Sequence, residues 1–165
     1  YCHISYFCLK YINMRQLISI LLIISFSLSS CDNDLTQKII SSYPDGTPSK
    51  IEFYKWHGDN EVLIKHVRYY QNGEKMEEGS FLNDNRNGKW TYWHPNGNIW
   101  SIGYYKEGIR DGATEVYFKS GKEQYTGYYT NGDASGKWTF WDGEGIKVKE
   151  VYYENGKKLK EVILD

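Results

Sequence analysis

The side chains best suited to chemistry in this sequence are its histidines and its carboxylates, because both can bind metal ions or move protons. The four histidines are His3, His57, His66 and His94. No two of them lie at a metal-ligand spacing with a carboxylate. His94 precedes Pro95 in a turn signal, and His66 stands where a later, similar segment carries Trp90. The sequence therefore predicts neither a metal site nor a cofactor.

Serines and paired carboxylates give no catalytic constellation either. A Gly-x-Ser-x-Gly elbow and a phosphate-binding glycine loop are both absent from the sequence. Glu77 and Glu78 are adjacent, so in a strand their side chains point to opposite faces and cannot act on one substrate atom. We expect a protein that is not an enzyme.

The remaining candidate for chemistry is the thiol of Cys31. A segment typical of a targeting signal precedes it. No cysteine follows Cys31, which excludes a disulfide framework in the rest of the chain. Residues 14–30 contain a basic Arg15 and a twelve-residue apolar run at 17–28, too short for a permanent membrane span and typical of a signal peptide. We interpret residues 1–13 as sequence read from upstream of a true start at Met14.

The end of that segment, Leu28-Ser29-Ser30-Cys31, resembles a bacterial lipobox. The resemblance implies lipid attachment at Cys31 and a membrane contact through that lipid, since each buried CH₂ contributes roughly 0.8 kcal/mol. The following Asp32-Asn33-Asp34 resembles the surface-export signal of Bacteroidetes lipoproteins, although an Asp directly after the Cys can mean inner-membrane retention in enteric bacteria. We expect a lipid-anchored protein of the cell envelope, on the outer rather than the inner membrane.

Beyond Cys31 the chain is dominated by glycines and aromatic residues that recur every 24 residues. The glycine series are Gly79, Gly103 and Gly127; Gly88, Gly112 and Gly136; Gly108, Gly132 and Gly156; and Gly73, Gly97, Gly121 and Gly145. The aromatic columns are Tyr69, Trp93, Tyr117 and Trp141; Phe81, Tyr105, Tyr129 and Tyr153; and Tyr104, Tyr128 and Tyr152. Trp90 and Trp138 also match each other, with Thr114 between them.

Each 24-residue unit predicts two antiparallel strands joined by turns. In one unit, residues 101–106 and 113–118 are the expected strands, and residues 107–112 are the expected turn between them. The glycines of the last series mark the turns between units, because tight reversals require positive φ. We expect a tether over 31–42 and the repeat domain over 43–165, with a longer first hairpin that turns at 56–60 and a last strand after Gly156.

The unit from Gly127 to Gly145, G-x-Y-x-x-G-x-x-x-G-x-W-x-x-W-x-x-x-G, resembles the MORN repeat in its bacterial variant. That resemblance implies an all-β fold, an elongated and curved antiparallel meander of tandem hairpins. Bacterial proteins of this kind are often described as antitoxin components of toxin–antitoxin systems. Two positions depart from the pattern: Val151 replaces a repeat glycine, and Thr114 replaces a tryptophan.

The aromatic columns have two interpretations, packing within the sheet and contact with a partner. Period-two alternation places Trp90 and Tyr92 on one face and Trp93 on the other. The packing role is favoured for the columns as a whole. If one column binds a partner, we expect the one that is aromatic in every full unit: Tyr69, Trp93, Tyr117 and Trp141.

The net charge limits the classes of partner that we expect. The part from Cys31 onward has 18 basic and 21 acidic residues, a net charge of −3 without a basic patch, so nucleic acid is not expected. Our preferred hypothesis is a non-catalytic envelope lipoprotein whose repeat sheet binds a protein partner or acts as a scaffold. The alternatives are a glycan-binding or peptidoglycan-binding module, and an antitoxin or immunity-type protein.

Overall fold

A computed structural model describes residues 35–164 of the chain. Cys31, the signal segment at 14–30 and residues 1–13 lie outside the described residues, so their predicted roles stay predictions. Within residues 35–164 there is no helix of the length and apolarity needed to cross a membrane.

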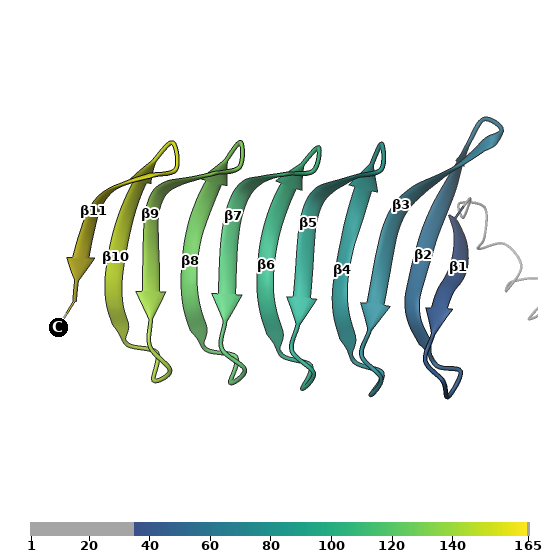
Figure 1. Cartoon of the computed structure of the whole chain (residues 1–165), viewed down its shortest axis with the longest axis horizontal. Coiled ribbons are helices and arrows are strands. Elements are labelled where there is room, and N and C mark those ends of the chain that lie inside the picture. Colours follow the sequence, from purple (N-terminus) through teal and green to yellow (C-terminus); the bar gives the residue numbers. More distant parts are fainter. Residues whose placement is uncertain (1–34, 165) are drawn as a thin grey trace, which may run out of the picture. The chain divides into compact units, whose positions relative to one another are not determined.

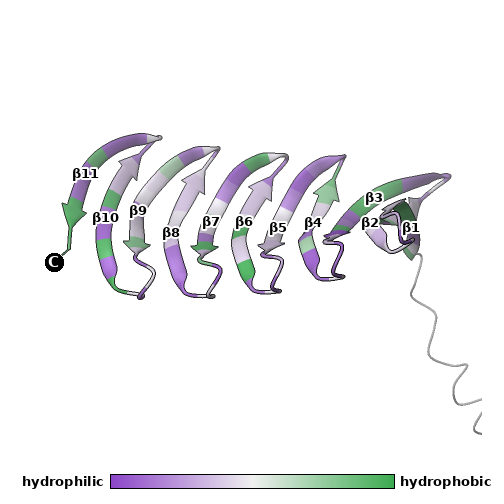
Figure 2. Ribbon diagram, turned by 60° about the horizontal axis from the view of Figure 1, so that its bottom comes forward, coloured by the Kyte–Doolittle hydropathy of each residue, from purple (hydrophilic) through white to green (hydrophobic). Residues whose placement is uncertain are grey.

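Eleven strands form one antiparallel sheet in which every strand pairs with its neighbours in sequence, from β1 at one edge to β11 at the other (Figure 1). The strands are β1 (Leu35–Ser42), β2 (Pro48–His57), β3 (Asn60–Tyr69), β4 (Lys75–Leu82), β5 (Asn85–Trp93), β6 (Ile99–Lys106), β7 (Ile109–Tyr117), β8 (Glu123–Thr130), β9 (Asp133–Trp141), β10 (Lys147–Glu154) and β11 (Lys157–Ile163). The predicted all-β meander of hairpins is confirmed, and its strands bow in one direction (Figure 2).

The 24-residue period is visible in the strand boundaries themselves. β4, β6, β8 and β10 begin at Lys75, Ile99, Glu123 and Lys147, and the intervening strands β5, β7, β9 and β11 begin at Asn85, Ile109, Asp133 and Lys157. Equivalent residues of successive units therefore lie two strands apart at the same height in the sheet.

The structure corrects two boundaries. Leu35–Ser42, assigned to the tether, is strand β1 and pairs with β2 through partners such as Thr36 and Tyr54. This strand carries no repeat glycine, so the periodicity that defined the domain could not include it. The turn expected over 107–112 is only Glu107-Gly108, because β7 begins at Ile109 and continues through a bulge that contains Gly112.

The first and last predicted elements are present. β2 and β3 form the longer first hairpin, with ten residues in each strand. β11, after Gly156, closes the sheet at its C-terminal edge.

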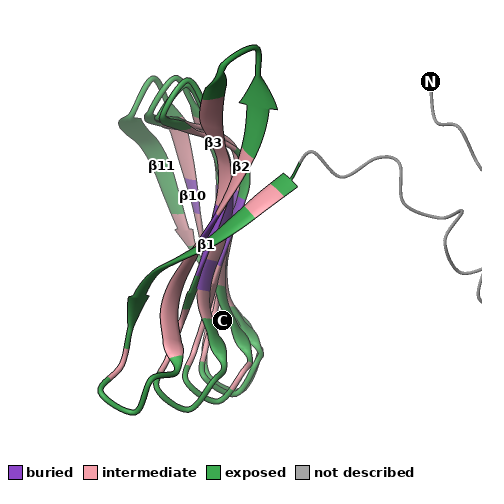
Figure 3. Cartoon of the chain, turned by 90° about the vertical axis from the view of Figure 1, so that its right-hand side faces the viewer, coloured by how far each residue is buried: buried purple, intermediate pink, exposed green. Residues whose placement is uncertain are grey.

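The core is a single layer, made by side chains that pack against one another on the sheet. Polar and apolar residues are mixed along the strands (Figure 2), and the buried ones gather midway along them (Figure 3). Trp90 is 0% exposed and Trp138 is 7% exposed, although no second layer of described residues covers them. We call the face that carries these two tryptophans the ring face, and the other the opposite face.

Candidate functional site

Two aromatic clusters on the ring face are closed by their own side chains. In the first, His66, Phe81 and Tyr105 surround Trp90 edge-on, with ring centroids at 5.1, 5.3 and 6.0 Å. Trp90 lies over Gly79 of the preceding strand so closely that a Cβ on that glycine would be 2.1 Å from the indole. The glycine thus makes room for the ring, which is how a one-layer sheet buries an indole.

An arginine completes the first cluster. The Arg86 guanidinium lies 4.1 Å from the centroid of Trp90, a cation–π distance, and its Nη1 donates a hydrogen bond of 2.8 Å to the hydroxyl of Tyr92. Burial raises the pKa of Tyr92 to about 12. The guanidinium of Arg86 and the hydroxyl of Tyr92 are therefore partners of each other within the protein.

The second cluster repeats this arrangement 48 residues later in the chain. Trp138 lies over Gly127, where an added Cβ would be 2.3 Å from the indole. Tyr125, Tyr129 and Tyr153 surround Trp138 with centroids at 5.8, 5.1 and 5.7 Å. This cluster is also closed.

Between the two clusters lies a recess of about 350 Å³, which we call the central recess. Tyr92, Ser101, Val116 and Tyr125 stand directly opposite one another on β5, β6, β7 and β8, so the two tyrosines flank the two smaller residues. Trp100, Gln124 and Arg110 complete the lining. Trp100 is 49% exposed and its ring centroid is 6.2 Å from that of Tyr92.

Arg110 is the charged group of the central recess. Its guanidinium lies 5.7 Å from the ring centroid of Tyr105 and 5.1 Å from that of Tyr129. Among residues 35–164, no carboxylate lies within ion-pair distance of it. None of the residues lining the recess is acidic. The recess thus presents a half-buried cation to any group that enters it.

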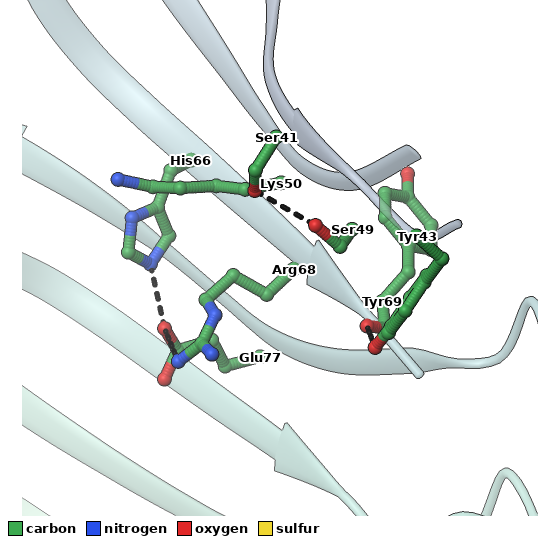
Figure 4. Close-up of a pocket in the computed structure, with 8 residues that line it drawn as sticks. All are labelled: Ser41, Tyr43, Ser49, Lys50, His66, Arg68, Tyr69 and Glu77. Atoms are coloured by element: carbon green, nitrogen blue, oxygen red, sulfur yellow. Dashed lines mark hydrogen bonds and ion pairs between the residues drawn. The ribbon is translucent and has the colours of Figure 1, made fainter. Parts of the chain in front are cut away.

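A second recess, of about 310 Å³, lies on the ring face near the first hairpin (Figure 4). Its charges are paired internally: His66 Nε2 and Arg68 Nη1 lie 3.1 and 3.5 Å from the same oxygen of Glu77. The pKa of Glu77 is lowered, first by its contact with His66. That contact is close but poorly aligned for a hydrogen bond, so we regard it as mainly electrostatic.

The second recess does not assemble a hydrolytic site. The hydroxyls of Ser41 and Ser49 lie 2.7 Å from each other, and Tyr43 donates to the carbonyl of Tyr69 at 2.8 Å (Figure 4). His66 packs its ring against Trp90 in the position that tryptophan holds in the next unit. This recess therefore has polar side chains where the aromatic clusters have rings. No group of three potential metal ligands occurs in the described part of the chain.

The predicted binding column lies together, at one end of alternate strands. Tyr69, Trp93, Tyr117 and Trp141 are the last residues of β3, β5, β7 and β9, and all four are half-buried. Lys75 and Lys147 place their ammonium groups 5.5 and 5.9 Å from the ring centroids of Trp93 and Trp141.

Tyr117 in this column is held by its own strand. It donates a hydrogen bond of 2.6 Å to Glu115, which raises the pKa of Tyr117 to about 12. The column is therefore well supplied with partners inside the sheet, and its binding role stays a prediction.

The predicted turn glycines lie in the four turns that join the units. Gly73, Gly97, Gly121 and Gly145 have φ of 85, 84, 90 and 88°, and each donates its N–H to the carbonyl three residues earlier. Side chains also tie each turn to the next: Asn72 Nδ2 donates to the carbonyl of Pro95, and Asn96 Nδ2 to that of Lys119. These ties hold the aromatic columns in register.

Sequence reasoning missed the central recess. Its signal was present in the departure at Thr114, where the neighbouring units have Trp90 and Trp138, and in Val116, where they have Tyr92 and Phe140. Only the register shows that both losses fall on the ring face beside Arg110.

Comparison with known proteins agrees with this fold. The family model described as "MORN repeat variant" matches residues 86–107, which contain most of β5 and β6. No curated protein matches the chain.

A solved structure entitled "Glycosylation Associate Protein (Gap123) complex from Streptococcus agalactiae" is similar to the chain, with a TM-score of 0.39 and 21% sequence identity. The similarity covers 73% of this chain and 21% of that one, so this chain spans about a fifth of the length of that protein. The class defined by the fold and the family match is an open β sheet that contains a MORN repeat variant.

Proposed function

We propose that this chain is a non-catalytic binding module or scaffold of the cell envelope, held at the membrane by lipid on Cys31 and contacting its partner through the ring face. The MORN repeat variant supports a repeat-based binding role. The single-layer sheet supports it too, since no second layer of described residues covers the ring face.

One observation carries the choice of the ring face. Its two aromatic clusters are closed, whereas the central recess between them is open and holds Arg110 without an acidic partner. Trp100, at the rim, exposes about half of its surface. An exposed aromatic residue at the edge of a recess is typical of an interaction site.

Photo-crosslinking in cells tests the contact. A photoreactive phenylalanine analogue at position 100 places the probe at the rim of the recess, and the same analogue at Thr126, in the middle of the opposite face, is the matched control. We expect discrete crosslinked products from position 100 only. Equal yields from both positions would exclude the ring face as the contact surface.

The anchor is tested separately. Metabolic labelling with palmitate should label the full chain. The Cys31→Ser variant should lose both the label and its association with the membrane fraction. Retention of label and membrane association in Cys31→Ser would contradict the anchor without bearing on the ring face.

The central recess favours a glycan as the second candidate partner. Tyr92, Tyr125 and Trp100 offer aromatic surfaces, and Ser101 and Gln124 offer hydrogen-bonding groups beside them. This mixture of rings and neutral polar groups suits a sugar, which has apolar C–H faces and hydroxyl edges.

A further inference from the structure

We infer that the central recess binds a carboxylated sugar unit, with the carboxylate on Arg110 and the sugar ring between Tyr92 and Tyr125. The inference rests on the proposed function, and it names the class of ligand that the ring face would bind. The repeat allows this site to be compared with equivalent sites in the same protein, because the position of Arg110 recurs in β5, β9 and β11.

The four equivalent positions are Arg86, Arg110, Ala134 and Lys158. Arg86 lies against the indole of Trp90 and donates a hydrogen bond to the hydroxyl of Tyr92, so it has a cation–π partner and a hydrogen-bond acceptor inside the protein. Ala134 carries no charge, and Lys158 is paired with Glu161 at 2.8 Å. In the described part of the chain, Arg110 alone keeps the charge without an ion pair or the partners of Arg86.

Both partners are lost in the middle unit. The indole position is Thr114 there, and the hydroxyl position is Val116, which has no acceptor. The nearest side-chain atom to a Cβ added at Gly103 is 3.9 Å away, on Tyr105, so no indole lies over that glycine. The middle unit thus lacks two rings that its neighbours have, and the central recess occupies part of that space.

The charge of Arg110 selects an anion. Its guanidinium is flanked by the rings of Tyr105 and Tyr129, which restricts water on both sides. A planar guanidinium in such surroundings binds a carboxylate through two parallel hydrogen bonds. Because no lining residue is acidic, the protein itself does not supply that carboxylate.

The walls and the volume select a compact ligand with apolar faces. A cavity of about 350 Å³ lies at the lower end of the range for small-molecule sites. Tyr92 and Tyr125 stand at opposite sides of it, on β5 and β8, and Ser101 and Gln124 in its lining can form hydrogen bonds with hydroxyl groups. A pyranose ring with one carboxylate satisfies all of these groups at once.

The position of the recess disfavours an acidic peptide. Extended peptides usually bind a sheet by adding a strand at a free edge, where backbone groups are unpaired. The recess lies over β5 to β8, in the interior of the sheet, where each strand is paired on both sides. Recognition here depends on side chains alone, which suits a sugar unit better than a chain that needs backbone partners.

The test uses the full chain in detergent and follows the indole N–H signal of Trp100 by NMR. The probes are the methyl glycosides of glucuronate, galacturonate, N-acetylneuraminate and N-acetylmuramate, with methyl glucoside and methyl galactoside as neutral controls. We expect at least one acid to bind at least about tenfold more tightly than the neutral sugars, the loss expected when a bidentate charged contact is missing.

Two variants and a control locate the site. Arg110→Gln removes the charge, and Val116→Phe restores the ring that Phe140 supplies in the next unit, so it fills the recess with a residue the fold already accepts. Both should weaken acid binding at least about tenfold, with an unchanged or higher unfolding midpoint in Val116→Phe. Lys89→Gln, which removes a cation from the opposite face, should leave binding unchanged.

Several outcomes overturn the inference. They are failure of all four acids to bind, equal binding of acidic and neutral sugars, unchanged binding in Val116→Phe, and equal or tighter binding of a capped aspartyl tripeptide. If crosslinking from position 100 persists in any of these cases, the ring face remains the contact surface and only the ligand class is wrong. If crosslinking also fails, the proposed function falls with it.

Discussion

At the scale of single residues, packing on the ring face depends on a tryptophan that lies over a glycine of the preceding strand. Trp90 covers Gly79 and Trp138 covers Gly127, with no space left for a methyl group at either glycine. In the middle unit Gly103 has no tryptophan over it. The same glycine column therefore has a packing role at two positions and not at the third.

Gly79→Ala should destabilise the protein by about 1–3 kcal/mol, because the added methyl group displaces the indole of Trp90 from the buried cluster. Gly103→Ala is the matched control, and its free energy of unfolding should stay within about 0.5 kcal/mol of the parent protein. Urea unfolding measures both. Equal losses in the two variants would assign the cost to the backbone and not to the indole.

Glu77 makes the free energy of unfolding depend on pH. Its pKa is lowered in the folded protein, chiefly by His66, so it contributes stability above its unfolded pKa and loses that contribution as pH falls from there through the folded pKa. The free-energy advantage of the parent over Glu77→Gln should therefore be larger at about pH 6 than at about pH 3.5. Urea unfolding at both values measures it, with the exposed Glu154→Gln as control; a constant difference would contradict the linkage.

At the scale of the hairpin, each unit turns through two residues that both have positive φ. Asn83-Asp84, Glu107-Gly108, Asn131-Gly132 and Asn155-Gly156 occupy equivalent turns, with φ near 50° at each first residue. Asn tolerates this conformation better than Glu, because its short amide can bond the local backbone. The middle unit therefore has the least favourable first turn residue, as well as the missing rings.

Glu107→Asn should raise the free energy of unfolding by roughly 0.5–1 kcal/mol, since it relieves strain that the equivalent turns avoid with Asn at this position. Chemical denaturation gives the value. Glu123→Asn, at an exposed strand position without positive φ, should give no gain. A similar gain from both substitutions would show that charge, and not turn geometry, is responsible.

At the scale of the whole sheet, stability is built from contacts between adjacent strands. All strand pairs in the described part of the chain are sequence neighbours, from β1 with β2 to β10 with β11. Such a repeat array gains stability from each interface, so its interior strands have two stabilising neighbours and its edge strands one.

Hydrogen exchange should follow that gradient. We expect backbone amides of β5 to β8 to exchange more slowly than those of β1 and β11, because an edge strand can open without disturbing the rest. Exchange followed by mass spectrometry on the full chain measures the order. Uniform protection across all eleven strands would instead indicate one cooperative unfolding unit.

Periodicity alone determined the strands, their antiparallel order and the unit length, because a hairpin repeat is encoded locally by turn residues and alternating side chains. It failed at Leu35–Ser42, which joins the sheet only by pairing with β2 and carries no turn signal of its own. Among the predicted residues, the turn glycines follow from local φ requirements and could be read directly.

The central recess was decided by the tertiary structure. Residues 92, 101, 116 and 125 are spread over four strands, and only the register with its bulges brings them opposite one another on one face. The sequence pattern marked the departure at Thr114, whereas the fold showed that Thr114 and Val116 together leave Arg110 without its acceptor and open a space beside it. Burial and charge pairing depend on neighbours across the sheet, which a one-dimensional pattern does not specify.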